Sequence, residues 1–212
     1  MPNRKLKLKI CGMREPDNIL EVKALKPDYM GFIFYPESPR FVKSLTYEVV
    51  HLASMHDIEP IPVFVDASVT SILHTTEIYP FTIVQLHGHE TPETCAALRA
   101  NGLNVIKAIS LSDSKDLEVT KLYRDCCDYF LFDTKSLVYG GSGNHYDWDI
   151  LQNYNETVPF FLSGGIGPND AKKILAFEHP QLFGIDINSQ FEIKPALKDV
   201  RLIKTFIDQL NS

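Results

Sequence analysis

Short apolar runs alternate with longer amphipathic stretches from one end of the chain to the other. Apolar runs of this length are typical of buried strands, and apolar residues that recur every three or four positions are typical of one helix face. The pattern predicts strands at Leu6–Ile10, Tyr29–Phe34, Ile61–Val65, Thr82–Leu86, Asn104–Ile109, Tyr129–Phe132, Pro159–Leu162 and Leu182–Ile187. It predicts helices near residues 16–26, 45–56, 69–78, 92–101, 114–123, 148–153, 169–177 and 197–209.

This repetition of strand and helix predicts a parallel sheet, because right-handed crossovers place consecutive strands side by side. Eight such units close most simply into a (β/α)8 TIM barrel. The alternative is a doubly wound open sheet, which usually has about five or six strands and a glycine-rich turn after the first. Here only Cys11-Gly12-Met13 follows the first strand. We therefore expect one barrel domain over residues 1–212, since no Pro/Gly-rich linker divides the chain.

Neighbouring residues of a strand point to opposite faces, and this alternation orients the first strand. Outward packing against helices is expected for Leu6, Leu8 and Ile10, so that Lys7, Lys9 and Cys11 face the barrel interior. An unpaired ammonium group inside a barrel is costly. We therefore predict that Lys9 is buried and paired with a carboxylate.

Composition and charge restrict the partners. The net charge of -6 argues against binding of nucleic acid through a basic face. The longest apolar runs, such as 29–34 and 158–162, fall far short of the roughly 20 residues that a membrane helix needs. Residues 1–5 lead into the first strand without an apolar signal region, so we expect a cytoplasmic location. A small molecule is the expected substrate, with no membrane or nucleic acid as partner.

The four cysteines do not form a disulfide framework in a chain of this length. Two of them are adjacent, which strains the usual bridge geometry, and no Cys-x-x-Cys pair suggests structural zinc or a dithiol centre. We therefore interpret all four as thiols: Cys11, Cys95, Cys126 and Cys127.

Two side chains that can transfer protons stand where predicted strands end. Cys11 follows the first strand, and Asp133 follows the sixth. In a parallel barrel the carboxyl ends of all strands meet at one rim, where reacting groups collect, so this pair suggests acid–base catalysis. The alternatives are a cysteine that only fills space and an aspartate that only caps a loop.

The loops after the seventh and eighth strands suit a phosphate group. Ser163-Gly164-Gly165-Ile166-Gly167 contains glycines that allow positive φ and a close approach of the backbone to a ligand. After the last strand, Asn188, Ser189 and Gln190 offer amide or hydroxyl donors. Barrels that bind phosphate usually do so with these two loops.

Seven motifs occur in an order that resembles the phosphoribosylanthranilate isomerases of tryptophan biosynthesis. Two positions depart from that resemblance: Asn188-Ser189-Gln190 stands where members often have Ser-Ser-Gly, and Asp66 where they often have Asn. The motifs are Lys9-Ile10-Cys11-Gly12, Ser38-Pro39-Arg40, Gln85-Leu86-His87-Gly88, Phe132-Asp133-Thr134, Gly140-Gly141-Ser142-Gly143, Ser163-Gly164-Gly165 and Gly184-Ile185-Asp186.

The resemblance implies a (β/α)8 barrel that performs an Amadori rearrangement of N-(5-phosphoribosyl)anthranilate without metal or organic cofactor. It implies that Asp133 is the general acid that opens the furanose ring and that Cys11 is the general base at C2′. A cationic neighbour or loop amides would have to lower the pKa of Cys11 for this role. The resemblance leaves open whether the protein is a monomer or a homodimer.

Three further residues are candidates for contacting the substrate. Arg40 is either an exposed cation or, as the motifs favour, the residue that binds the anthranilate carboxylate through two parallel hydrogen bonds. His87 and His89 formally resemble a His-x-His metal pair, but no clear third ligand follows, so we expect no metal and expect His87 to orient a neighbour. Asp186 faces inward by parity and is a candidate for the substrate amine or ribose.

Two other functions compete with this interpretation. The histidine-pathway isomerase performs the same type of rearrangement, but it has a strand-one aspartate and two similar half-barrels, whereas this chain has Cys11 and no convincing internal repeat. A non-catalytic barrel that binds a phosphorylated ligand would tolerate the loss of Cys11 or Asp133. Both residues are present, which favours an enzyme.

Overall fold

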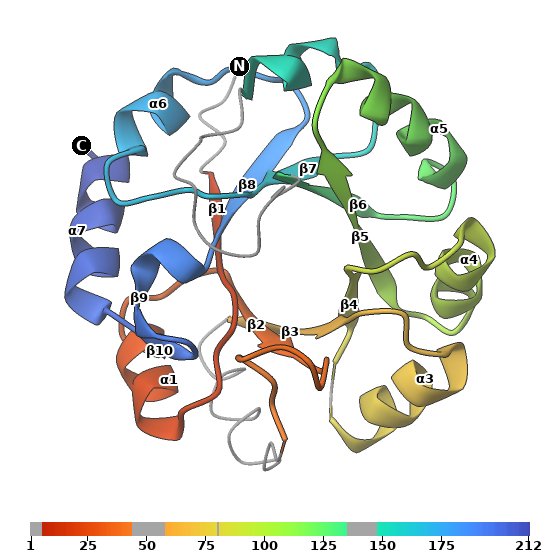
Figure 1. Cartoon of the computed structure of the whole chain (residues 1–212), viewed down its shortest axis with the longest axis horizontal. Coiled ribbons are helices and arrows are strands. Elements are labelled where there is room, and N and C mark those ends of the chain that lie inside the picture. The colour runs from red at the N-terminus through yellow and green to blue at the C-terminus, as the bar shows by residue number, and fades with distance from the viewer. Residues whose placement is uncertain (1–5, 44–57, 80, 135–147) are drawn as a thin grey trace.

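Eight parallel strands form a closed barrel in the computed structural model of the chain, which describes residues 6–43, 58–79, 81–134 and 148–212. Each strand pairs with the next, and β8 pairs with β1 to close the ring (Figure 1). The (β/α)8 fold predicted from the repeating pattern is confirmed. The strands are β1 (Lys7–Ile10), β2 (Tyr29–Ile33), β3 (Glu59–Phe64), β4 (Ile83–Leu86), β5 (Asn104–Leu111), β6 (Tyr129–Thr134), β7 (Phe160–Leu162) and β8 (Leu182–Ile187).

Helices surround the barrel on its outside (Figure 1). A short hairpin of β9 (Glu192–Lys194) and β10 (Leu197–Lys198) lies between β8 and the last helix. The helix expected over 45–56 lies outside the described residues. The helices are α1 (Pro16–Lys23), α3 (Val69–Ile78), α4 (Pro92–Ala100), α5 (Thr120–Tyr123), α6 (Ala171–Ala176) and α7 (Val200–Leu210), with 3-10 turns η1 (Ser114–Val119), η2 (Trp148–Asn153) and η3 (Ser189–Phe191).

The start of the last helix differs from the expectation. Its predicted first residue, Leu197, belongs to β10 instead, and α7 begins at Val200. The reason is the cap: the side chain of Asp199 accepts hydrogen bonds from the backbone N–H groups of Arg201 and Leu202, both at 3.1 Å. A carboxylate that satisfies the first free N–H groups fixes where a helix starts. Hydrophobic periodicity alone does not reveal this boundary.

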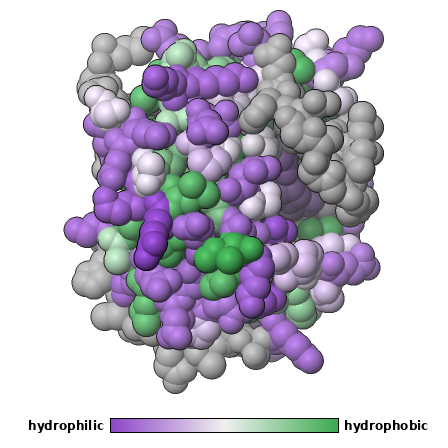
Figure 2. All heavy atoms as spheres, turned by 60° about the vertical axis from the view of Figure 1, so that its left-hand side comes forward, coloured by the Kyte–Doolittle hydropathy of each residue, from purple (hydrophilic) through white to green (hydrophobic). Residues whose placement is uncertain are grey.

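Two apolar layers stabilise the fold, one inside the barrel and one between barrel and helices. α7 shows the outer layer clearly, because it buries Ile203 and Phe206, with the Phe206 ring against Phe191 of η3, while its other face is polar. On the side of α6 and α7, the surface is mostly hydrophilic with small, separate apolar patches (Figure 2). No helix within the described ranges is both long and apolar enough to cross a bilayer. The inner layer consists of Ile61, Ile83, Ile106, Ala108, Leu131 and Phe161.

Lys9 and Asp186 form an ion pair inside the barrel. They are register partners on β1 and β8, so their side chains leave the sheet on the same face at the same level. Lys9 Nζ lies 3.0 Å from Asp186 Oδ2, and the two side chains are 0% and 6% exposed. The predicted burial and pairing of Lys9 are confirmed. Lys7 lies one step nearer the amino end of the barrel, where it is partly exposed and pairs with Asp28.

Candidate active site

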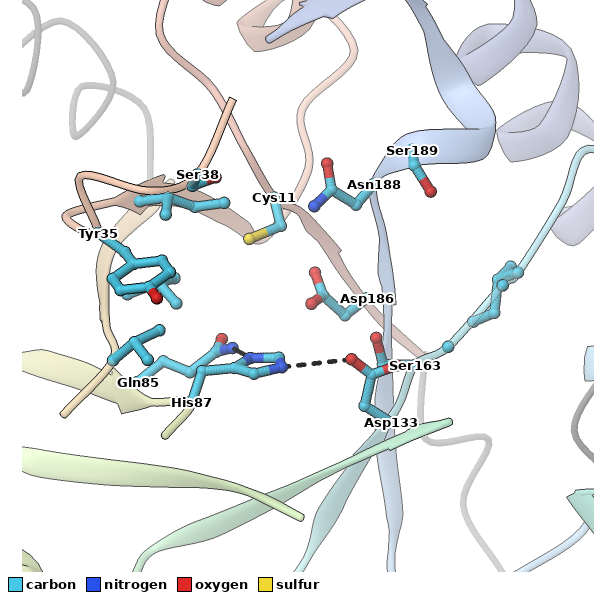
Figure 3. A pocket seen from close by; sticks show the side chains of 16 residues that line it. Cys11, Tyr35, Ser38, Gln85, His87, Asp133, Ser163, Asp186, Asn188 and Ser189 are labelled. Carbon is cyan, nitrogen blue, oxygen red and sulfur yellow. Dashed lines mark hydrogen bonds and ion pairs between the residues drawn. The ribbon is translucent and has the colours of Figure 1, made fainter. Parts of the chain in front are cut away.

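A cavity of about 280 Å³ opens at the carboxyl ends of the strands. Residues near or beyond the carboxyl ends of β1, β2, β3, β4, β6, β7 and β8 line it, because parallel strands bring these ends to one rim. Cys11 and Asp133 both line this cavity and face it from different sides (Figure 3). The two residues that the sequence singled out are therefore brought together, although more than a hundred positions separate them.

Cys11 is held where β1 ends. Its backbone N–H donates to Ile187 at 2.9 Å, which extends the β1–β8 pairing, and its side chain is 4% exposed. Gly31 on β2 leaves room for the thiol, since a Cβ atom added there would lie 2.6 Å from Cys11 Sγ. Burial raises the pKa of Cys11, while the ammonium groups of Lys9 and Lys198 act to lower it. The expected cationic neighbours are present, but in this structure burial outweighs them.

The Lys9–Asp186 ion pair lies next to Cys11. Burial alone would lower the pKa of Lys9, but the adjacent Asp186 and Cys11 raise it above its usual value, so Lys9 keeps its charge. Asp186 Oδ2 accepts from Lys9, whereas its other oxygen, Oδ1, is buried without a hydrogen bond to any described residue. Because Asp186 also lines the cavity, this acceptor is available to a ligand.

Gln85, His87 and Asp133 form a chain of contacts across the cavity (Figure 3). Gln85 Nε2 lies 2.8 Å from His87 Nδ1, and an amide nitrogen can only donate. His87 Nδ1 is therefore the acceptor, which leaves the proton of the neutral ring on Nε2, 3.3 Å from Asp133 Oδ2. His87 is thus in direct contact with Asp133. His89 turns to Asp66 at the surface instead, so the two imidazoles do not converge on one point.

The two loops predicted to hold phosphate lie on one side of the cavity. Gly164 and Gly165 have φ values of 83° and 69°, the left-handed conformation that glycine adopts without strain. Both glycines, with Asn188 and Ser189, line the cavity. Asn188 Oδ1 accepts from Lys198 Nζ at 2.7 Å, which leaves the amide nitrogen of Asn188 as a donor.

Arg40 lies beside Gly12 and is not one of the residues that line the cavity, and its guanidinium group is paired with a protein carboxylate. It makes bidentate contact with Glu192, with Nη2 to Oε2 at 2.6 Å and Nε to Oε1 at 2.9 Å. Glu192 also accepts from Lys198 at 2.7 Å. The sequence did not suggest Glu192 or Lys198 for the site. A lysine directly before the helix cap Asp199 is typical of an exposed position, yet the Lys198 side chain is 0% exposed.

A closed (β/α)8 barrel with a thiol and a carboxyl facing a cavity at the carboxyl ends of its strands defines a barrel enzyme. Residues 8–209 match the family model described as N-(5'phosphoribosyl)anthranilate (PRA) isomerase. The chain belongs to this family.

Known members of this family match nearly the whole length of the chain. The N-(5'-phosphoribosyl)anthranilate isomerase of Parabacteroides distasonis is 45% identical over 205 residues, 96% of this chain and 92% of that protein. The phosphoribosyl anthranilate isomerase of Thermotoga maritima has a TM-score of 0.82 at 30% identity, covering 97% of this chain and 98% of the other. Another member, solved with reduced 1-(o-carboxyphenylamino)-1-deoxyribulose 5-phosphate, has a TM-score of 0.79 at 27% identity and the same coverage of 97% and 98%. This chain is an isomerase of tryptophan biosynthesis, which converts N-(5'-phosphoribosyl)anthranilate into 1-(2-carboxyphenylamino)-1-deoxyribulose 5-phosphate.

Proposed function

We propose that Cys11 is the general base and Asp133 the general acid of this isomerisation. The observation that carries the proposal is their placement on different sides of one cavity, with space for a ligand between them. The reaction needs two proton transfers at two atoms of the sugar, the ring oxygen and C2′. Two groups that face the same sugar from different sides can serve these two atoms.

In the first step, Asp133 gives its proton to the furanose ring oxygen. The bond from C1′ to this oxygen breaks, and the nitrogen lone pair forms the C=N bond of a protonated Schiff base. His87 donates to Asp133 Oδ2 and fixes the orientation of the carboxyl group. The proton therefore starts from a side chain whose position is set before the substrate reacts.

In the second step, the Cys11 thiolate removes the proton from C2′. The electrons of the C–H bond form a C=C bond to C1′, and the iminium nitrogen becomes a neutral enolamine, which tautomerises to the ketone. Burial opposes the thiolate in the free enzyme, but Lys9 and Lys198 favour it. The cationic Schiff base adds a further positive charge beside the thiol at the moment when the base is required.

The remaining candidates hold the two ends of the substrate. We assign the phosphate to Gly164, Gly165, Asn188 and Ser189, which line one side of the cavity. We assign the anthranilate carboxylate to Arg40, which would exchange Glu192 for the substrate while Lys198 keeps Glu192 paired. Asp186 Oδ1 is the acceptor for the substrate amine or a ribose hydroxyl.

The ligand of the solved relative supports this assignment. Reduced 1-(o-carboxyphenylamino)-1-deoxyribulose 5-phosphate carries a phosphate at one end and a carboxylate at the other. We extend this class of phosphosugar ligand to the present chain and propose that the enzyme acts in the cytoplasm on this small substrate, as a monomer or a homodimer. Turnover of phosphoribosylanthranilate generated in situ, followed by the loss of its fluorescence, tests the roles in wild type, Cys11→Ser and Asp133→Asn. Robust turnover by both variants would reject them.

Replacing Lys198 by methionine should weaken the base without removing it. The pKa of Cys11 would rise further because one of its two cationic neighbours is lost, so the acid limb of the pH profile of kcat/KM should move up by about 1 pH unit. At neutral pH this corresponds to about a 10-fold lower kcat/KM. Lys7→Met, at the other end of the barrel, is the matched control. An unmoved acid limb in Lys198→Met would contradict the electrostatic role.

Replacing Arg40 by lysine should weaken substrate binding more than catalysis. Lysine keeps the charge but cannot make two parallel hydrogen bonds to a carboxylate, so we expect KM to rise about 10-fold with a smaller change in kcat. Arg14→Lys is the control, because Arg14 pairs with Glu15 and donates to Pro39 at the same rim. An unchanged KM in Arg40→Lys would remove Arg40 from the binding site.

A further inference from the structure

Three of the four cysteines lie together outside the barrel and away from the cavity. Cys95 is on α4, and Cys126 and Cys127 follow α5 directly before β6. All four cysteines are free thiols, and the sulfur atoms of these three lie within 4.8 Å of one another. The three residues are buried at 0%, 8% and 5% exposure. The isomerase reaction uses none of them.

The charges around this cluster do not favour a metal cation. Lys107 and Glu90 are the charged pair that acts on Cys95, and they are bound to each other at 3.1 Å. Three thiolates around a monovalent or divalent cation would leave a net negative charge in a buried site, and the nearby cations Lys107 and Arg99 are already paired with Glu90 and Asp128. Among the described residues no His, Asp or Glu joins the three sulfurs as a further ligand.

Two of the three thiols are also held in their protonated form, whereas the hydrogen bond with Cys127 lowers the pKa of Cys95. The hydrogen bond to Cys95 and burial raise the pKa of Cys127, and burial raises the pKa of Cys126. The Cys126 S–H donates to the carbonyl oxygen of Tyr123 at 3.3 Å. A reagent that takes up the thiol protons and gives a neutral product suits this buried three-sulfur cluster, because binding then leaves no uncompensated charge there.

We propose that these three thiols form a capture site for trivalent arsenic. Arsenous acid, As(OH)3, condenses with three thiols to give As(SR)3 and three molecules of water. Three As–O bonds break and three As–S bonds form, each thiol proton leaves with a hydroxyl group as water, and no electrons are transferred. Reagent and product are both uncharged, which matches the surroundings of the cluster. Cys11 stands alone in its cavity and cannot chelate in this way.

The geometry supports a centre that joins two segments of the chain. Cys126 and Cys127 provide two sulfurs from one short turn, and Cys95 provides the third from α4. The side chain of Cys126 is only partly buried, and it gives a small neutral reagent access from the surface. Bound arsenic would cross-link α4 to the segment before β6, so it should stabilise the folded chain against unfolding.

The test incubates the reduced full-length protein with arsenite and measures its intact mass under native conditions. Wild type and Cys11→Ser should both gain one arsenic atom and lose three hydrogens, and the unfolding temperature should rise. Digestion of the wild-type adduct at neutral pH should give one species that joins the peptide of Cys95 to the peptide of Cys126 and Cys127.

The Cys95→Ser variant and the wild-type digest show whether arsenic is bound by all three sulfurs. Cys95→Ser should lose the three-sulfur adduct. The proposal is overturned by the absence of an adduct on wild type, by an identical adduct on Cys95→Ser, or by a digest in which arsenic is bound without Cys95. If Cys95→Ser does not fold, the wild-type digest answers the question alone. Because Cys11→Ser is included, the result is independent of the catalytic role of Cys11.

Discussion

Cys11→Ser is expected to lower kcat/KM for N-(5'-phosphoribosyl)anthranilate by about 10²–10⁴-fold. Serine fits the site because it is nearly the same size, so Gly31 still leaves room for the side chain. A hydroxyl, however, is far harder to deprotonate than a thiol, and Lys9 and Lys198 cannot offset that difference. The loss therefore falls on proton removal from C2′, and binding of the substrate should change little.

A deuterium label at C2′ tests whether proton removal has become the slow step. In Cys11→Ser, turnover of the labelled substrate should show a larger primary isotope effect than in wild type. The fluorescence loss of the substrate gives both rates. Cys95→Ser is the matched control, since it makes the same thiol-to-hydroxyl change outside the cavity and should keep wild-type kinetics. Near-normal turnover by Cys11→Ser would contradict the role of Cys11 as base.

The parts of the site that could be predicted from the sequence depend on strand geometry. Alternation along β1 places Lys9 and Cys11 on the inner face, and the carboxyl ends of parallel strands bring Cys11 and Asp133 to one rim. The partner of Lys9 also follows from geometry once the register is known, because Lys9 and Asp186 lie opposite each other on β1 and β8. The sequence indicated that Lys9 needs a carboxylate, but the barrel register was required to name it.

The parts that could not be predicted depend on packing between loops. The β9–β10 hairpin carries Glu192 and Lys198 and brings Glu192 to Arg40, and this hairpin has no signature in the hydrophobic pattern. The guanidinium group of Arg40 is therefore paired with Glu192, whereas the motifs favoured Arg40 as the residue that binds the substrate carboxylate. Glu192 is paired with both Arg40 and Lys198. Lys198 can therefore keep Glu192 paired when Arg40 turns to the substrate carboxylate, which is why we still propose Arg40 for substrate binding.

Asp133→Asn is the second change for which we expect a large loss, about 10²–10⁴-fold in kcat. Asparagine keeps the shape of the side chain, and its oxygen can still accept from His87 Nε2, so the cavity should remain intact. An amide is not a proton donor for the ring oxygen, and ring opening therefore becomes the slow step. Asp208→Asn, an exposed position paired with Lys204, is the control and should leave the rate unchanged.

The isotope effect separates the two roles. When ring opening limits turnover, the C2′–H bond is broken after the slow step, so deuterium at C2′ should have little effect on the rate of Asp133→Asn. The same label should slow Cys11→Ser strongly. Opposite responses of two variants with similar losses would assign the acid to Asp133 and the base to Cys11. A large isotope effect in Asp133→Asn, or turnover near that of wild type, would contradict this order of proton transfers.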